Sequence, residues 1–400
     1  MGGAPPEPRR ADVVVAVDGG GDAAEAVRTA QRVSGELGGR YPSRRSIVLL
    51  LSEGANEPAL ALDGGGDPRA AVQPWSHPGQ GAIEAVLRAA ERFDAAAVAL
   101  VAPTLENGHD PGADRLVGPV LDDGFDMVCP WYATQRFEGV IGTGIVRPMV
   151  RTLFGRRLRH PLGREIALSR QAVAHLLGEA WAADPTRAGD RMWVVASILA
   201  RGFRVCEAFL GAPPPRVAEP SADLAATLAS VVGLLFHEMR VHAAEWQRVK
   251  GSRPVKSYGE ETAPPPADAR QPQVASMVSA FQLGYQELGR LWAEVLPPQT
   301  LLALKRLSRE PPERFAMEDA LWARIVCDCA VAYHLATMDR ALLLRAMVPL
   351  YLGWAAGYVR EVAELPYPDL QARSERLCAA FELAKPHLIA RWRWPDRFNP

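Results

Sequence analysis

Short apolar runs alternate with segments of helical periodicity in the first half of this chain. Four runs have the length and residue types of buried strands: 11–17, 46–51, 95–101 and 126–129. The segments between them carry apolar residues on one helical face: 22–37, 81–93 and 114–122. Strands and helices alternating at this spacing predict an α/β fold with a mostly parallel sheet covered by helices. Residues 53–74, which include three consecutive glycines, are predicted to form a loop.

Sheets of this kind bind their ligands beyond the carboxyl ends of the strands. The segments that follow Val17, Leu51 and Val101 are therefore expected to surround one crevice. The first of these segments, from Asp18 to Gly21, lacks the spacing of a dinucleotide fingerprint and the Lys-Ser/Thr pair of a P-loop. A nucleotide-binding role and a plain turn both stay open for it.

The second half of the chain has a helical pattern. Five segments have amphipathic or buried helical spacing: 224–249, 274–295, 301–307, 318–338 and 341–362. The predicted organisation is a leader over residues 1–10, an α/β domain over 11–220 and a helical region over 221–400 packed on it. The aromatic residues of the last two helices are predicted to be core residues: Trp322, Tyr333, Tyr351, Trp354 and Tyr358.

Composition and charge exclude several functional classes. The 400 residues are 48% hydrophobic and 23% charged, which is typical of a soluble globular protein. The formal net charge is −1, so no global field points to an anionic membrane, and nucleic acid is not expected as a partner. The five cysteines are scattered, which predicts buried thiols in a reducing cytosol. Neither a signal peptide nor a transmembrane helix is expected, so a cytoplasmic location is predicted. A monomer and a homodimer both stay open.

A series of short motifs follows in a fixed order after residue 123. Asp126, Pro130 and Tyr132 match a D-x-V-x-P-x-Y segment, and residues 137–139 and Pro148 match an F-E-G…P segment. A basic run, R-x-L-F-G-R-R-L-R, comes next, followed by a His-Pro-Leu-Gly turn at 160–163 and a strand-like GFRVCEAFLG at 202–211. In this order and spacing the chain resembles the GT-A-type nucleotide-sugar glycosyltransferases, in the bacterial group around mannosylglycerate synthase and glucosyl-3-phosphoglycerate synthase.

The resemblance implies a GT-A fold with a helical extension and an enzyme that transfers a hexose from a nucleoside-diphosphate sugar. The acceptor it implies is small and anionic, similar to glycerate. The positions that match donor-binding segments are Asp18, Glu53, Gly79, Gly81, Ala102 and Thr104. Those that match acceptor-side segments, or could bind an anion, are Tyr132, Arg147, Arg151, His160, Gly163, Asp190 and Arg191. Glu165 and Arg164 are the predicted catalytic residues.

The chain departs from the family at its metal site. GT-A enzymes hold a divalent cation with a D-x-D motif at the end of the third strand, where this chain has Ala102 and Thr104. Neither residue offers the carboxylate oxygens that such cations prefer. The family's metal-binding His is replaced by residues 212–215, and the acidic residue before Trp193 is replaced by Arg191, with Asp190 displaced by one position. No metal and no other cofactor is therefore expected.

Two interpretations follow from these losses. In one, the enzyme works without a metal, and arginines such as Arg164, Arg191 or those of the 147–159 run neutralise the diphosphate. In the other, the chain is catalytically inactive and serves as a binding or partner subunit. His109 and Asp110 are alternative metal ligands or exposed loop residues, and Asp122–Asp123 is a metal pair or, with better support, the end of a helix.

Two further features have competing interpretations. Glu165 either orients an acceptor hydroxyl or is a salt-bridged residue at the edge of a strand. The run that holds Arg147, Arg151, Arg156, Arg157 and Arg159 either recognises an anion or forms a solvated cationic face. Arg147 and Arg151 are four residues apart, which predicts that they share one face of a helix.

Overall fold

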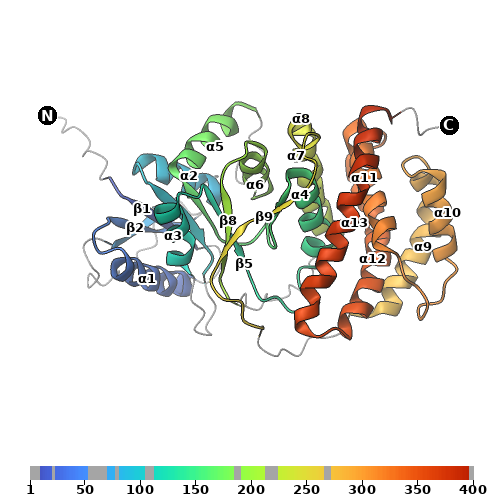
Figure 1. Cartoon of the computed structure of the whole chain (residues 1–400), viewed down its shortest axis with the longest axis horizontal. Coiled ribbons are helices and arrows are strands. Elements are labelled where there is room, and N and C mark those ends of the chain that lie inside the picture. The colour runs from blue at the N-terminus through green and yellow to red at the C-terminus, as the bar shows by residue number, and fades with distance from the viewer. Residues whose placement is uncertain are drawn as a thin grey trace. The chain divides into compact units, whose positions relative to one another are not determined.

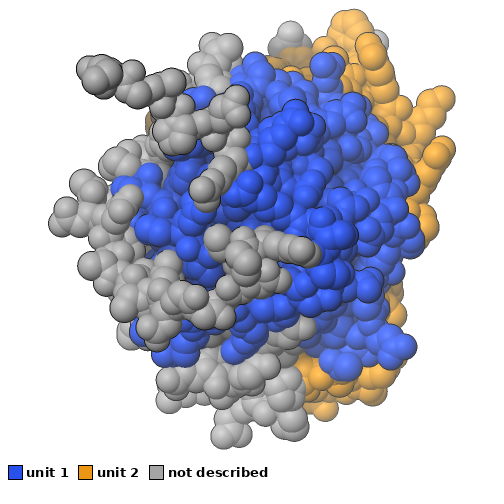
Figure 2. Space-filling view, turned by 90° about the vertical axis from the view of Figure 1, so that its left-hand side faces the viewer, with its two compact units in different colours: residues 1–133, 158–215, 255–262 blue, residues 134–157, 216–254, 263–400 orange. Residues whose placement is uncertain are grey.

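The computed structural model describes residues 10–19, 23–52, 70–76, 81–103, 112–183, 191–211, 224–264 and 272–395. Its chain forms two compact units. Unit 1 consists of residues 1–133, 158–215 and 255–262, and unit 2 of residues 134–157, 216–254 and 263–400. They are coloured blue and orange in Figure 2. The expected domain limits stay a prediction, but the contacts group residues 134–157 with the helical unit and residues 255–262 with the sheet.

Unit 1 is built on a mostly parallel sheet, drawn in Figure 1. Its described strands are β1 (Val13–Asp18), β2 (Ser46–Ser52), β3 (Ala70–Ser76), β4 (Ala97–Val101), β5 (Met127–Trp131), β7 (Ile166–Ser169), β8 (Val205–Phe209) and β10 (Lys256–Tyr258). They lie in the order β10-β8-β5-β7-β4-β1-β2-β3. Every neighbouring pair is parallel except the two pairs that β7 makes with β4 and β5. The predicted α/β class is confirmed.

Helices cover both faces of this sheet. They are α1 (Ala23–Arg40), α2 (Ala82–Arg92), α3 (Ala113–Asp123), α5 (Arg170–Ala183) and α6 (Arg191–Ala200). The apolar faces of α1 and α3 form one core with Val13, Val15 and Val17. The alternate residues Val14 and Ala16 are equally buried and point to the other face, where α2 packs on β1 and β4. Burial on both faces explains why these strands are apolar throughout.

The predicted loop over residues 53–74 is wrong at its end, because residues 70–74 belong to β3. Residues 53–69 lie outside the described part of the chain. The sequence of β3 contains Pro74, which cannot donate a backbone hydrogen bond to a neighbouring strand. The proline is tolerated because β3 is the last strand in the sheet order and pairs with β2 alone.

Unit 2 consists mainly of helices. Its described elements are the π-helical turn η1 (Gly142–Val146), α4 (Arg147–Phe154), α7 (Leu224–Val241), α8 (Ala243–Trp246), α9 (Val274–Ala293), α10 (Pro298–Leu307), α11 (Asp319–Leu335), α12 (Arg340–Ala363) and α13 (Tyr367–Arg393), with the short strands β6 (Arg156–Arg157) and β9 (Arg253–Pro254). The predicted helices are confirmed, except that 224–249 is divided into α7 and α8. Helix α13 was not expected from the sequence.

Stacked indole rings form the centre of unit 2. Trp322 and Trp354 are fully buried, and their rings stack with centroids 5.6 Å apart and planes 13° from parallel. The indole N–H of Trp322 donates to the carbonyl oxygen of Gly144 at 2.9 Å. A Cβ atom on Gly144 would lie 2.3 Å from Cζ3 of Trp354. The predicted core role of the aromatic residues on α11 and α12 is confirmed for the two tryptophans and for Tyr333, Tyr351 and Tyr358.

Two helices of unit 2 are long and apolar enough to cross a membrane by length and composition alone. They are α7 and α12, each with a mean hydropathy of 1.4 over the best window. In α12, 67% of that window is buried inside the protein, as in a core helix, whereas in α7 the share is 39%. The absence of a transmembrane segment therefore stays a prediction.

Gly144→Ala is expected to lower the free energy of unfolding by about 1–3 kcal/mol, because the new methyl group meets a rigid indole ring. Gly142→Ala is the matched control, since it lies in the same turn and its Cβ would meet no atom within 4 Å. Chemical denaturation of both variants and the wild type measures the difference. Equal stability of the two variants would show that the Trp354 ring does not restrict this position.

Candidate functional site

The carboxyl ends of the parallel strands bring several predicted site residues to one edge of the sheet. Val17 of β1 pairs with Val101 of β4, so Asp18 and Ala102 end neighbouring strands at the same level. Strand β7 runs in the opposite direction and begins with Ile166, which pairs with Leu100. Glu165, which precedes Ile166, therefore lies at the same edge. Tyr132 follows β5 there as well.

Tyr132 and Glu165 form the centre of the site. The hydroxyl group of Tyr132 donates a short hydrogen bond to Oε2 of Glu165, and it accepts one from the backbone N–H of Arg164 at 3.1 Å. Glu165 is only 8% exposed. Burial, followed by the neighbouring Glu165 carboxylate, raises the pKa of Tyr132 well above its usual value. The tyrosine is thus held as a neutral donor to a buried carboxylate.

The predicted His-Pro-Leu-Gly turn packs directly against this pair. The backbone N–H of Gly163 donates to the carbonyl oxygen of His160 at 3.0 Å, which closes the turn. The backbone N–H of Tyr132 donates to Nδ1 of His160 at 3.3 Å, so this ring nitrogen acts as the acceptor. A Cβ atom on Gly163 would lie 2.2 Å from Cγ of Pro130. Glycine at 163 therefore allows the turn to approach the end of β5.

Arg191, the first residue of α6, supports the same segment. Its Nη1 donates to the carbonyl oxygen of Glu165 at 2.8 Å, and its Nη2 donates to that of Arg164 at 2.6 Å. This two-pronged contact fixes the backbone that carries Glu165. The Arg164 side chain is exposed. The structure thus brings together five predicted residues, Tyr132, His160, Gly163, Glu165 and Arg191, with Arg164 beside them.

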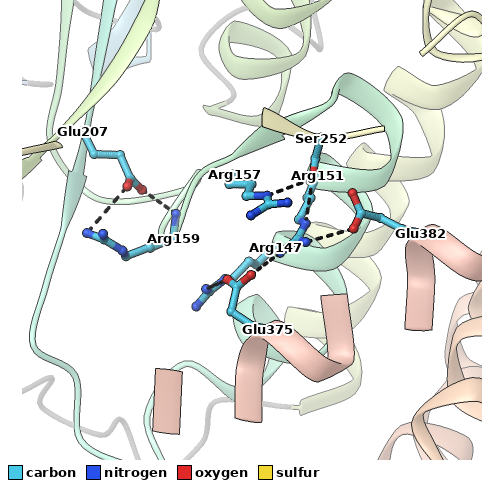
Figure 3. A network of polar contacts seen from close by, with 8 residues as sticks. All are labelled: Arg147, Arg151, Arg157, Arg159, Glu207, Ser252, Glu375 and Glu382. Carbon is cyan, nitrogen blue, oxygen red and sulfur yellow. Dashed lines mark hydrogen bonds and ion pairs between the residues drawn. The ribbon is translucent and has the colours of Figure 1, made fainter. Parts of the chain in front are cut away.

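An ion pair that involves a buried carboxylate in the middle of β8 could not be found by the sequence reasoning. Glu207 is 1% exposed, and it accepts a short hydrogen bond from the backbone N–H of Arg159. The Arg159 guanidinium group lies 3.7 Å from Oε2 of Glu207 (Figure 3). It also lies 3.9 Å from the centroid of the Trp131 ring. The only sequence signal for this pair is one acidic residue inside the apolar strand VCEAF.

Arg147 and Arg151 have carboxylate partners within unit 2 (Figure 3). Arg147 contacts Glu375 at 2.8 Å, and Arg151 contacts both Glu375 and, at 2.9 Å, Glu382. Both carboxylates belong to α13. Burial opposes the charge of Glu375, but the two guanidinium groups lower its pKa below the usual value. The predicted shared helical face is confirmed, and these ion pairs account for both arginines without an anionic ligand.

The donor-side residues are only partly described. Glu53, Gly79, Thr104 and Asp190 lie outside the described residues, as do His109, Asp110 and 212–215. Gly81 caps the start of α2, and Asp18 ends β1. Ala102 is buried directly after β4 and offers no ligand atom. Within the described ranges, no three His, Cys, Asp or Glu residues are grouped as a metal site would require.

The interpretation of Asp122–Asp123 as a helix end is confirmed. Helix α3 ends at Asp123, and Gly124 follows in the left-handed conformation, with φ 67°. Asp123 accepts hydrogen bonds from Tyr258 and, at 3.4 Å, from Lys256. The five cysteines are all free and buried, as predicted.

The comparisons with known proteins find likeness in structure only. No family model matches the chain, and no curated protein sequence matches it either. The chain is similar to the solved structure of glucosyl-3-phosphoglycerate synthase from Mycobacterium tuberculosis in complex with phosphoglyceric acid, with 19% identity, a TM-score of 0.38 and coverage of 57% of this chain and 79% of that one. The same synthase with Mg²⁺ and uridine diphosphate gives 20% identity, a TM-score of 0.39 and coverage of 57% and 79%.

A mannosyltransferase from Pyrobaculum calidifontis, in complex with GDP-Man and Mn²⁺, is similar over more of the chain. It gives 14% identity and a TM-score of 0.35 over 98% of this chain and 90% of that one. These structures are thus, by their names, a glucosyl-3-phosphoglycerate synthase in two complexes and a mannosyltransferase. Likenesses of this degree do not assign an activity to the present chain.

Tyr132 is expected to resist ionisation when the protein is made alkaline. Because its pKa is raised in the folded state, the stability that it contributes is present below about pH 10 and is lost as the pH rises further. The difference in phenolate absorbance between the wild type and Tyr132→Phe should therefore show no titration near pH 10 while both are folded. A normal phenolate signal at that pH would contradict the buried contact with Glu165.

Proposed function

We propose that the chain is a GT-A-type glycosyltransferase that transfers a hexose from a nucleoside-diphosphate sugar to a small anionic acceptor. The observation that carries the proposal is the buried Glu165 carboxylate at the carboxyl edge of a mostly parallel sheet. Ligands of such sheets bind at that edge. The resemblance of residues 124–169 to the centre of the family's sequence, with the 160–163 turn that opens the acceptor side, supports the same assignment.

Glu165 has the arrangement of a group that orients a hydroxyl. Tyr132 donates a hydrogen bond to Oε2 of Glu165, and none of the described residues donates one to Oε1. The second oxygen is therefore available to accept a hydrogen bond from an acceptor hydroxyl and direct it toward the sugar. Tyr132 and Arg191 hold the side chain and backbone of Glu165 in place, so the acceptor meets a carboxylate whose position is already fixed.

We propose that the charge which develops on the leaving diphosphate is neutralised by arginine. Arg164 is exposed at the edge that carries Glu165, and a guanidinium group can bind two phosphate oxygens at once. The metal ion that the family resemblance implies has no ligand at Ala102. The proposed reaction therefore uses cationic side chains and no metal.

The absence of a metal ligand at Ala102 also favours a second function. If Ala102 and Thr104 abolish donor activation, the chain binds a sugar nucleotide or a partner protein, such as an active relative of this chain, without catalysis. The two functions differ in turnover, and not in the fold or in the ability to bind a nucleotide.

The first test measures turnover of UDP-hexoses and GDP-hexoses, with and without a glycerate-type acceptor, in excess EDTA. The wild type should retain its activity there, and Glu165→Gln should lower kcat/KM by about 100-fold or more. Glu91→Gln is the control, because Glu91 is an exposed residue of α2. Activity that requires Mg²⁺ or Mn²⁺ would overturn the metal-free proposal, and absence of turnover together with nucleotide binding would support the second function.

The second test measures donor affinity by calorimetry with UDP and GDP sugars. Arg164→Ala should weaken donor binding by about ten-fold, since one charge-assisted contact to phosphate is lost. Glu165→Gln should leave the donor affinity nearly unchanged, because Glu165 is assigned to the acceptor. Equal affinities for the wild type and Arg164→Ala would remove Arg164 from the donor site.

A further inference from the structure

One end of unit 2 is formed by the termini of four helices. The His334 ring, near the end of α11, stacks on Trp392 near the end of α13, with centroids 4.0 Å apart. The Trp392 ring also contacts that of Trp246, the last residue of the short helix α8 that follows α7, with centroids 5.3 Å apart. Arg340, the first residue of α12, donates to the carbonyl oxygen of Tyr333 at 3.1 Å. The carboxyl ends of α7, α11 and α13 thus lie beside the start of α12, near the C-terminal end in Figure 1.

Large apolar side chains are exposed at this end. They are Val241 at 46%, Leu335 at 43%, Leu342 at 37% and Trp394 at 61% exposure, and together they are called the helix-end patch. They make up four of the seven exposed large hydrophobic residues among those described. Scattered single apolar residues need no explanation, but a cluster at one end of a helical unit is typical of a docking surface.

Cationic side chains flank the helix-end patch. Arg240 and Arg340 both lie close enough to His334 to lower its pKa, after the larger effect of burial. Arg393 immediately precedes Trp394, and its Nε donates to the side chain of Gln247 at 2.6 Å. Asp339 lies at the same end and caps α12 by accepting from the backbone N–H of Leu342 at 2.8 Å, and the buried Glu238 lies 3.4 Å from Nε2 of His242. The patch is therefore apolar with a cationic rim.

We infer that the helix-end patch docks on the surface of an anionic lipid bilayer. Val241, Leu335 and Leu342 would enter the boundary between headgroups and acyl chains, where a tryptophan such as Trp394 is also favoured. Arginines on the rim can extend their apolar stems along this boundary and place their guanidinium groups against lipid phosphates.

Charge favours a bilayer over a second copy of the chain. A two-fold contact through the same patch would bring Arg240, Arg340 and Arg393 of one copy toward those of the other. The like charges would repel each other across the contact. An anionic lipid surface instead supplies opposite charge to the arginines of the rim. It also buries the apolar residues of the patch.

The test is sedimentation of the full chain with vesicles of phosphatidylglycerol and phosphatidylcholine, compared with vesicles of phosphatidylcholine alone. The wild type should bind the anionic vesicles at least ten-fold more tightly, and binding should weaken as salt is raised. Arg240→Gln should weaken the binding by about five-fold, because it removes one cation that would lie near the anionic surface. The double variant Val241→Ser/Leu335→Ser should lose most of the binding.

Leu383→Ser is the matched control, because Leu383 is 82% exposed on α13 but lies three turns before Trp394, outside the patch. It should bind as the wild type does, and circular dichroism should show that every variant is folded. Equal binding to neutral and anionic vesicles, or an equal loss with Leu383→Ser, would overturn the inference. So would a dimer in solution that Leu335→Ser disrupts without any vesicle binding by the wild type, since it would assign the patch to a second copy.

Discussion

The hydrogen bond from Tyr132 to Glu165 is the interaction on which the proposed site depends. A buried carboxylate without a donor costs several kcal/mol, so Glu165 is tolerated at this edge only because Tyr132 meets it there. That meeting requires β7 to run against its neighbours, which brings its first residue to the carboxyl ends of β4 and β5. It also requires a glycine at 163, because any side chain would push the turn away from Pro130.

Arginine is used inside both units as a cross-link between segments far apart in the sequence. Arg151 and Arg147 connect α4 with Glu375 of α13, more than 220 residues later, and Arg373 connects α13 with Asp319 of α11. A planar group with five donors suits this role, because it can satisfy two carboxylates, or two carbonyl oxygens, in one fixed geometry. The basic run at 147–159 is therefore not one surface. Its first members belong to unit 2, whereas Arg159 pairs with Glu207 in unit 1.

The sequence predicted those parts of the fold whose signal is local. Strands buried on both faces are short apolar runs, and helices repeat apolar residues every three to four positions, so β1, β2, β4, α9 and α12 could be located. Helix α13 could not, because it buries Arg373, Lys385 and Arg391, which have no apolar periodicity and become acceptable only beside partners on other elements. The Tyr132–Glu165 contact also could not be predicted from local sequence, because it joins residues on different elements. The family resemblance pointed to both residues, but only the register of β7 brings them together.

The loss of a ligand at Ala102 and the presence of Glu165 bear on activity in opposite directions. A chain that served only as a scaffold would gain stability from an apolar residue at position 165, because a buried carboxylate is costly even when it is partly satisfied. Here one carboxylate oxygen is held by Tyr132, and Arg191 fixes the backbone on which Glu165 is carried. In the proposed function, a ligand hydroxyl would donate to the second oxygen and complete the hydrogen bonding of this carboxylate. Under that proposal, ligand binding at this edge would recover part of the free energy that burying Glu165 costs in folding.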